Sequence, residues 1–402
     1  MASAALPGFR DFYPRELAER AHIMRAWRDV ARRYAFVEYD GPPLEPLELY
    51  TKKSGDEIVG QLYAFADKGG RQVALRPEMT PTFARMVGAR ANALRKPVRW
   101  FSMPQLFRYE RQQKGRLREH FQLNVDIVGA SGIAADAELI ACAIDVMREL
   151  GLTSADVVAR VSDRRVLEAY LRALGVPGDA LAGAYAVIDK IERQPRDVSA
   201  AKLAAAGVPA GAVEAILDIA SVTLEELEER LGSGPAAPLV RDLRLLHTYV
   251  PALLGGDEGW LRLDLSIVRG LAYYTGMVFE LFDRTGEFRA ICGGGRYDNL
   301  LASLGGADLP ALGFGMGDVV LGELLRARGL MPDVEPRIDR WVLAEEEVPM
   351  ERVMAEAARL RAAGCSVEYA LEARSLSKQK KAAQSSGATE FVTVSNTPRS
   401  NG

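Results

Sequence analysis

Alternating hydrophobic and polar positions in residues 107–126 predict two antiparallel strands. A loop over residues 111–118 joins them and turns at Lys114 and Gly115. One face of the second strand is apolar and carries Phe121, Leu123, Val125 and Ile127. The opposite face of the strand pair is polar and carries Arg108, Glu110, His120, Gln122 and Asp126.

Two interpretations of this polar face stay open. A hairpin with one solvated face alternates in the same way. The composition favours a pocket for a polar ligand, because the face has amides, an imidazole and short acids but no lysine. The joining loop contributes Arg111, Lys114, Arg116 and Arg118, and such a cationic segment is suited to binding phosphates.

Helical spacing of apolar residues predicts a helix from Leu17 to Tyr34, with Pro14 at a position where a helix can start. Pro42 and Pro43 exclude a central strand, so the segment around them is expected at a sheet edge or a subunit contact. Further elements are expected as a hairpin over residues 62–65 and 73–75, a helix from Thr82 and a helix over residues 133–150.

Residues 163–255 are rich in Ala, Leu and Glu with helical periodicity. They are predicted to be a helical insertion between two parts of one sheet domain, with charges on a solvated face. Strand patterns return at residues 261–265 and 274–282, and a helix is expected over residues 319–328.

Three glycines, Gly313, Gly315 and Gly317, alternate with Phe314 and Met316. In a strand, this pattern leaves one face bare, so that a flat ring can approach the backbone. A bulged or tightly packed strand explains the pattern equally well.

Residues 330–336 are expected to be a linker to a small α/β domain over residues 337–402. Its strands are expected at residues 340–344, 366–370 and 390–394, and its helices at residues 350–363 and 377–386. The second helix carries Lys378, Lys380 and Lys381, which form either an RNA-binding patch or solvated surface.

Composition narrows the class of protein. The 402 residues, 48% hydrophobic and 26% charged, are typical of a soluble globular chain of two or three domains. A net charge of −3 excludes a general basic field for nucleic acid. Three scattered cysteines and three scattered histidines give neither a disulfide framework nor a metal-ligand spacing. No secretory signal or transmembrane run is recognised, so a cytoplasmic location is expected.

Two further segments carry candidate chemistry. Glu78 and Thr80 stand just before the helix expected from Thr82, where they are either its caps or ligand groups. Arg269 precedes Tyr273 and Tyr274, which makes it either a cation stacked near aromatic rings or a surface residue.

Taken together, these residues suit a nucleotide and an amino substrate. Arginines can bind phosphates, a strand without side chains can pack against a flat base, and carboxylates can bind an ammonium group. Because no serine or cysteine nucleophile with a nearby base is visible, phosphoryl or adenylyl transfer by positioning fits best.

At these residues the chain resembles the histidyl-tRNA synthetases, a family of class II aminoacyl-tRNA synthetases. The opening LPGFRD resembles the start of the family, and the region of Pro42 resembles class II motif 1, which lies at a dimer interface. FRYERQQKGRLREHFQ resembles motif 2, RGLAYYTG and GGGRYDNL resemble the two histidine signatures, and GFGMG stands where motif 3 belongs.

The resemblance implies an α+β fold. A class II antiparallel sheet flanked by helices would occupy residues 1–329, with the helical insertion at about residues 163–255. Residues 337–402 would form a shortened anticodon-binding-like α/β domain. The implied partners are L-histidine, ATP with Mg²⁺, tRNA(His) and a second copy of the chain.

The resemblance also implies site residues. For histidine these are Glu78, Thr80, Arg108, Gln122, Asp126, Arg269, Tyr273 and Tyr274. For ATP they are Arg108, Glu110, Arg116, His120 and Gly315. Arg108 and Arg269 would be catalytic, and no metal ligand is expected from the chain.

Three positions depart from the family pattern. Val320 stands at the place of the motif 3 arginine, Ala272 stands where many members have an acid, and the order of His120 and Phe121 is reversed. A plant-organelle-like branch of the family resembles the chain in all three respects.

Two other functions remain as alternatives. The synthetase-like regulatory subunit of ATP phosphoribosyltransferase resembles this fold without charging tRNA, but it usually lacks the arginine corresponding to Arg269 and the C-terminal domain. A pure RNA-binding protein would have a basic surface, which the composition does not support.

Overall fold

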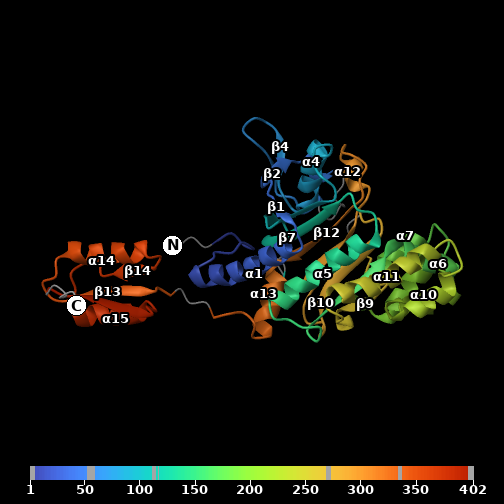
Figure 1. Cartoon of the computed structure of the whole chain (residues 1–402). Helices are drawn as coiled ribbons and strands as arrows, with labels where there is room; N and C mark the ends of the chain where they lie inside the picture. The colour runs from blue at the N-terminus through green and yellow to red at the C-terminus, as the bar shows by residue number, and fades with distance from the viewer. Residues whose placement is uncertain are drawn as a thin grey trace. The chain divides into compact units, whose positions relative to one another are not determined.

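The structure is a computed structural model that describes residues 5–51, 59–110, 115, 117–268, 273–333 and 337–396. The chain divides into two compact units (Figure 1). The first unit comprises residues 1–11 and 20–331, and the second comprises residues 12–19 and 332–402. Within the described ranges, no helix is long and apolar enough to cross a membrane.

The first unit is built on a large sheet that is mostly antiparallel. In the described part of the chain it has nine strands, in the order β1-β5-β7-β12-β11-β10-β8-β9, and β6 pairs with β7 outside this path. The strands are β1 (Val37–Glu38), β5 (Val98–Ser102), β6 (Gln105–Phe107), β7 (Glu119–Val128), β8 (Val157–Asp163), β9 (Leu261–Leu263), β10 (Met277–Asp283), β11 (Cys292–Arg296) and β12 (Ala311–Gly317).

Strand β7 is the longest strand of this sheet, and it divides polar from apolar residues as the alternation predicts. Leu123, Val125 and Ile127 are buried in the main hydrophobic core. This core also takes side chains from helices α1 (Pro14–Arg33), α5 (Ile133–Glu149) and α13 (Asp318–Ala327). These helices therefore cover the apolar face of the sheet.

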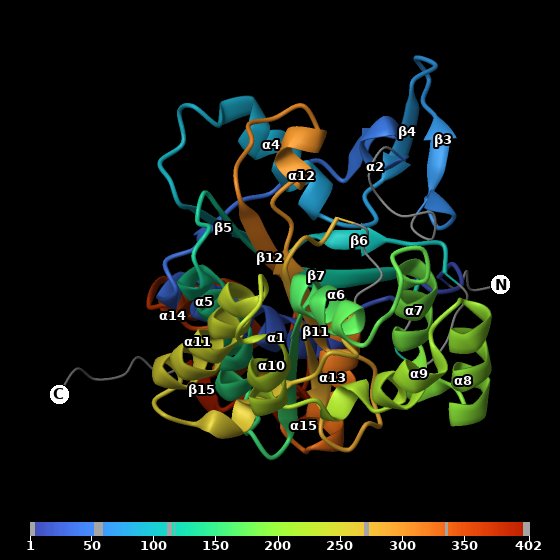
Figure 2. The same cartoon turned by 90° about the vertical axis from the view of Figure 1, so that its right-hand side faces the viewer.

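The opposite face of the sheet carries the polar side of β7. Helices α4 (Thr80–Arg90) and α12 (Leu300–Ser303) contact each other beside this face (Figure 2). Phe83 and Leu300 pack there with Val128 in a second core. Polar side chains of β7 thus lie between packed elements and not in open solvent.

The first strand of the predicted hairpin is shorter than its alternation predicts. Strand β6 ends at Phe107, and the amide of Glu110 donates to the carbonyl of Arg108 at 2.8 Å. This local bond turns the chain out of the ladder. The amide of Arg108 still donates to the carbonyl of Arg118 across the hairpin at 2.9 Å. Because Leu106 pairs with His120, Arg108 lies on the strand face of His120, and only Glu110 falls outside the alternation.

A second small sheet lies beside the hairpin region, where the amide of Phe107 donates to the carbonyl of Arg76 just after β4. It has the order β2-β4-β3, and helix α2 packs near it. The bounds are β2 (Leu44–Pro46), β3 (Ala64–Ala66), β4 (Gln72–Leu75) and α2 (Glu48–Thr51). Strand β1 is at the edge of the large sheet, as the prolines after it predict.

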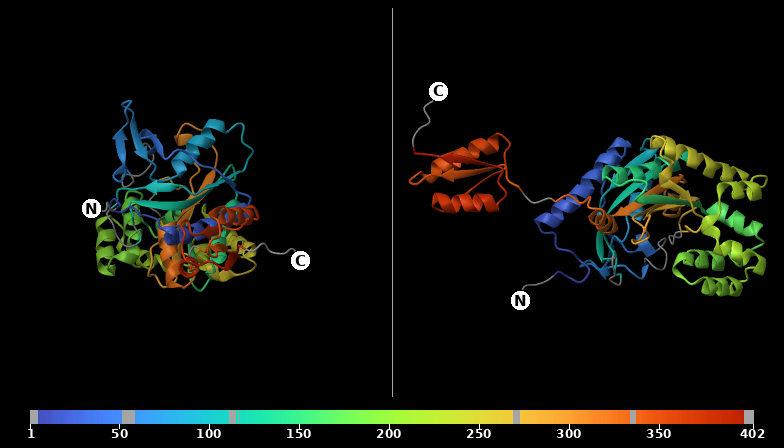
Figure 3. Two further views of the ribbon diagram at one scale, coloured as in Figure 1. Left: turned by 90° about the vertical axis from the view of Figure 1, so that its left-hand side faces the viewer. Right: turned by 90° about the horizontal axis from the view of Figure 1, so that it is seen from below.

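The predicted helical insertion is confirmed, and its helices lie together at one end of the large sheet (Figure 3). Its own hydrophobic core includes Leu167, Leu203 and Leu227. The helices are α6 (Arg164–Ala173), α7 (Leu181–Ile188), α8 (Arg196–Ala205), α9 (Ala210–Leu217), α10 (Leu224–Leu231) and α11 (Ala237–Leu253). Single 3₁₀ turns are η1 (Ile191–Arg193), η2 (Ile219–Ser221) and η3 (Glu258–Trp260).

The second unit is the small α/β fold that the sequence predicts. Its parallel sheet has the order β14-β13-β15, with hydrophobic clusters around Val342 and around Trp341. The elements are β13 (Arg340–Ala344), α14 (Met350–Ala362), β14 (Val367–Tyr369), α15 (Leu376–Ser385) and β15 (Glu390–Val394). Lys378, Lys380 and Lys381 are exposed on α15.

Candidate active site

The three glycines of β12 lie beside the polar side chains of β7. Gly313 pairs with Asp126 in the ladder, and an added Cβ there would overlap the Asp126 carboxylate. At Gly315 an added Cβ would lie 2.8 Å from the amide nitrogen of Gln122, and at Gly317 it would lie 3.9 Å from His120 Cδ2. Of the two interpretations, these contacts support the tightly packed strand, because the missing side chains make room for those of β7.

Asp126 is the most buried carboxyl among the predicted site residues, with 2% exposure. The hydroxyl of Tyr297, itself buried, donates to its Oδ1. Burial raises the pKa of Asp126 to about 7, although the bond from Tyr297 opposes this shift. Its Oδ2 is buried and has no hydrogen-bond partner within the described residues. This oxygen is available to a hydrogen-bond donor from a ligand or a water molecule.

Aromatic rings form one side of the same site. The ring centroids of Tyr273 and Tyr297 are 5.8 Å apart, and those of Tyr273 and Tyr274 are 5.1 Å apart. The hydroxyl of Tyr273 donates to Glu78 Oε2 at 3.2 Å. The structure thus brings Glu78, Asp126 and the two predicted tyrosines together.

Glu78 and Thr80 lie at the start of α4. The N-cap position is Met79, whose side chain makes no capping hydrogen bond. Glu78 is buried, with 4% exposure, and Thr80 is half-buried. Nε of Arg108 donates to the carbonyl of Pro77 at 2.8 Å, which fixes Arg108 beside this segment.

His120 lies at the start of β7 near Arg108. Burial, with the charges of Arg108 and Arg10, lowers the pKa of His120 to about 3. The imidazole is therefore neutral near pH 7 and is able to stack on a base. Glu110 is buried close by, where Arg118 donates to its carbonyl.

An ion-pair network holds the start of β7. Arg10 contacts Glu119 at 2.6 Å and Asp318 at 2.9 Å, and Asp318 accepts the amide of Phe121 at 2.9 Å. Both acids are buried. This network joins the N-terminal segment, β7 and α13 beside His120.

Two predicted residues cannot be placed. Arg269 and Arg116 lie outside the described residues, as do Arg111 and Lys114. Their assigned roles stay predictions.

Sequence reasoning missed Tyr297 as a site residue. The signal was present, because Tyr297 follows the run of glycines that forms β11, a fully buried strand. Gly294 and Gly295 have no room for a Cβ, so this run is strand packing and not a phosphate loop. Arg296 pairs with buried Asp136 and donates to the carbonyl of Ala130 at 3.0 Å, which anchors the end of β11.

Among the described residues, no group of three His, Cys, Asp or Glu side chains is arranged to hold an ion.

The fold defines the class of protein. The structure matches the crystal structure of histidyl-tRNA synthetase from Nostoc sp. PCC 7120 with a TM-score of 0.83 at 24% identity, over 98% of this chain and 92% of that one. A structure described as an ATP phosphoribosyltransferase regulatory subunit/histidyl-tRNA synthetase from Bacillus halodurans C gives 0.80 at 21% identity, over 98% and 99%. The fold is that of class II aminoacyl-tRNA synthetases, but it does not separate an enzyme from a regulatory subunit.

Sequence similarity identifies the family. The model of the family described as histidyl-tRNA synthetase matches residues 8–317. Histidine–tRNA ligase from Opitutus terrae is 47% identical over 389 residues, which are 96% of this chain and 89% of that protein. The chloroplastic/mitochondrial histidine–tRNA ligase of Arabidopsis thaliana is 41% identical over 391 residues, which are 97% and 80%. The chain belongs to the histidyl-tRNA synthetase family, and the predicted likeness to a plant organelle branch is confirmed.

Proposed function

We propose that this protein is a histidine–tRNA ligase. It activates L-histidine with ATP to histidyl-adenylate and then transfers the histidyl group to the 3′ end of tRNA(His). The relatives named histidine–tRNA ligase support this function over that of a regulatory subunit of ATP phosphoribosyltransferase.

The unpartnered Oδ2 of Asp126 is the observation that carries the proposal. An imidazole N–H would satisfy this buried oxygen, and the hydroxyl of Tyr297 holds the other oxygen in place. The rings of Tyr273 and Tyr274 would flank the imidazole, and Gln122 would contact the bound histidine. An aliphatic side chain would leave the carboxylate without its donor, so the pocket selects against it.

The remaining polar groups are suited to bind the α-ammonium and α-carboxylate groups of the substrate histidine. Glu78 and Thr80 would accept hydrogen bonds from the α-ammonium group. Arg108 would bind the α-carboxylate together with the α-phosphate of ATP, since its guanidinium can donate to two oxygens at once.

ATP would bind next to histidine through Arg108, Glu110, Arg116, His120 and Gly315. The neutral imidazole of His120 would stack on the adenine ring. Glu110 would accept a hydrogen bond from the amino group of adenine. Arg116 would contact the distal phosphates. Mg²⁺ would enter with ATP, bound to the phosphates.

The chemistry is positioning without a covalent protein intermediate. A carboxylate oxygen of histidine attacks the α-phosphorus, the bond to the β-phosphate oxygen breaks, and pyrophosphate leaves. Arg108 and Arg269 would stabilise the charge that gathers on the α-phosphoryl oxygens. A ribose hydroxyl of tRNA then attacks the carbonyl carbon, loses its proton, and AMP leaves.

We also propose that the enzyme is a cytoplasmic homodimer. Strand β1 lies at a sheet edge, and Val37 there is 61% exposed, so a second copy could cover this edge.

Aminoacylation tests the proposed function. Full-length protein with ATP, Mg²⁺ and tRNA(His) should attach labelled histidine to the tRNA, and a tRNA of another identity is the control. Adenylate formation without any transfer to tRNA(His) would contradict the second half of the reaction.

A further inference from the structure

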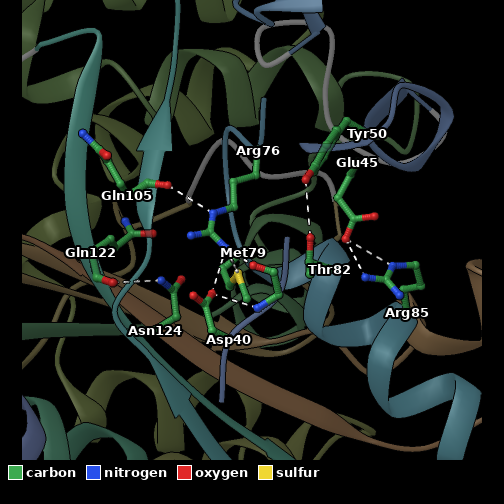
Figure 4. A network of polar contacts seen from close by, with 11 residues as sticks. Asp40, Glu45, Tyr50, Arg76, Met79, Thr82, Arg85, Gln105, Gln122 and Asn124 are labelled. Carbon is green, nitrogen blue, oxygen red and sulfur yellow. Dashed lines mark hydrogen bonds and ion pairs between the residues drawn. The ribbon is translucent and has the colours of Figure 1, made fainter. Parts of the chain in front are cut away.

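Arg76 stands between two segments that are far apart in sequence. It directly precedes Pro77 and Glu78, and only 5% of it is exposed. On one side lies the loop of residues 40–43, and on the other lies strand β6 (Figure 4).

The guanidinium of Arg76 bonds to both segments. Its Nη1 donates to Asp40 Oδ1 at 2.9 Å and to the carbonyl of Gly41 at 2.7 Å. Its Nε donates to the carbonyl of Gln105 in β6 at 3.1 Å. A planar guanidinium can make these bonds in different directions at once, whereas an ammonium group at the end of a lysine cannot span both segments.

The main chain of Arg76 also forms hydrogen bonds with both segments. Its amide donates to the carbonyl of Pro43 at 2.9 Å, and its carbonyl accepts the amide of Phe107 at 3.0 Å. Because Arg108 in turn donates to the carbonyl of Pro77, the site segment is bonded to both neighbours. A continuous set of hydrogen bonds thus connects the 40–43 loop with the segment that carries Glu78 and with Arg108.

The 40–43 loop also packs directly on α4. A Cβ at Gly41 would lie 2.5 Å from Cγ2 of Thr82, in the first turn of this helix. By contrast, the side chain of Asp40 is 69% exposed. The buried cation of Arg76 therefore depends on a carboxylate at the surface, so a change of the loop would leave the cation poorly paired.

A second arginine nearby provides a matched comparison. Arg85 on α4 donates to Glu45 Oε1 at 2.6 Å, so it also joins a helix to the small sheet (Figure 4). Both Nε and Nη2 of Arg85 donate to Glu45 Oε1, at 3.2 and 2.6 Å, and these bonds involve neither β6 nor the segment of Glu78.

We propose that Arg76 is a positioning residue that couples the 40–43 loop to Glu78 and Arg108. Histidine binding at these two residues then stabilises the loop, and an ordered loop in turn strengthens histidine binding. Such coupling is reciprocal by thermodynamic linkage. The inference rests on the proposed function, since it names histidine as the ligand.

Hydrogen–deuterium exchange of the full-length protein with and without L-histidine tests the coupling. In the wild type, histidine should slow exchange in residues 76–80 and 105–110 and also in residues 37–46. Arg76→Lys should reduce the protection of residues 37–46, although the main-chain bonds of residue 76 remain, and Arg85→Lys should retain the full protection. Asp40→Asn, a change at an exposed residue, should also weaken this protection. It replaces Arg76→Lys as the test of the coupling if Arg76→Lys does not fold.

Three outcomes decide between the proposals. Protection of residues 76–80 and 105–110 without protection of residues 37–46 in the wild type would overturn the coupling. Equal protection in wild type and Arg76→Lys would overturn it as well. Absence of protection in all three segments would contradict the proposed function instead, and the proteins without ligand would then decide the role of Arg76. In that case, faster exchange of residues 105–110 in Arg76→Lys than in Arg85→Lys supports the positioning role, and equal exchange overturns it.

Kinetics give a second readout. Arg76→Lys should raise KM for histidine by roughly tenfold in pyrophosphate exchange, while KM for ATP changes less, because Glu78 moves with Arg76. Unchanged KM for histidine in a variant whose thermal midpoint falls as in Arg85→Lys would show a purely structural role.

Discussion

Asp126 on β7 and Tyr297 just after β11 form a buried hydrogen-bonded pair, which in the proposed function selects the amino acid. Tyr297→Phe should remove the donor to Asp126 and raise KM for histidine by roughly tenfold or more. Pyrophosphate exchange measures this change. Tyr170→Phe is the matched control, since Tyr170 donates to Glu226 at 2.8 Å within the helical insertion. Equal effects of both variants would contradict the role of Tyr297 in the pocket.

The raised pKa of Asp126 has a consequence for stability. Its pKa rises from the usual 3.8 to about 7, so between these values the native state keeps a proton that the unfolded chain has lost. The free energy of unfolding therefore falls as pH rises through this window and levels off above about pH 7. Asp126→Asn lacks this contribution, so its stability relative to the wild type should increase from pH 4 to pH 7 by up to about 4 kcal/mol. Urea unfolding of both proteins across this range checks the sign, and parallel curves would contradict the raised pKa.

Arg269 is expected to act on the transition state. Arg269→His should lower the rate of adenylate formation by about a hundredfold or more, while the Kd for histidine changes little. Rapid-quench measurement of adenylate and calorimetric titration with histidine separate the two. Similar losses in rate and in affinity would assign Arg269 to ground-state binding instead.

At the scale of elements, the pairing of β12 with β7 requires glycine at particular positions of β12. In Gly313→Ala the new methyl would overlap the Asp126 carboxylate and lie 2.8 Å from the carbonyl oxygen of Val125, so strand β12 must shift. This variant should lose about 1–3 kcal/mol of unfolding free energy. In Gly315→Ala the methyl meets the amide end of Gln122, which can rotate away. Urea unfolding should therefore show a smaller loss for Gly315→Ala, and the reverse order would contradict the packing at Gly313.

The sequence predicted many of the strands and helices and the faces that they bury. Alternation in residues 119–128 defines the faces of β7 because one face is buried in the core, and helical periodicity located α5 and the insertion. It failed at Glu110, whose amide bonds locally to the carbonyl of Arg108 and not across the hairpin. A bond between two backbone groups leaves no mark in the pattern of side chains.

The candidate site was predictable where residues follow one another on a strand or in a motif. Asp126 and Gln122 belong to a single alternating strand, so both were identified. Tyr297 and Arg76 depend on contacts between segments that are distant in sequence. Pairing partners of this kind follow from the tertiary fold and not from local periodicity, and so the alternation alone could not reveal them.

At the scale of the whole molecule, the described candidate site residues all belong to the first unit. A chain that ends at Asp333 should therefore retain histidine-dependent pyrophosphate exchange at nearly the full-length rate. Charging of tRNA(His) should fall, because the basic helix α15 with Lys378 and Lys381 would be missing. Parallel exchange and aminoacylation assays on both chains measure this difference. Loss of exchange in a folded shortened protein would contradict the assignment of the chemistry to the first unit.

The central claim is that this chain activates histidine. The most direct test is exchange of labelled pyrophosphate into ATP by the full-length protein, with each of the other amino acids in place of histidine. We expect exchange with histidine alone, despite Val320 at the motif 3 position. No exchange by a folded protein that still binds histidine would contradict the account and favour a regulatory role.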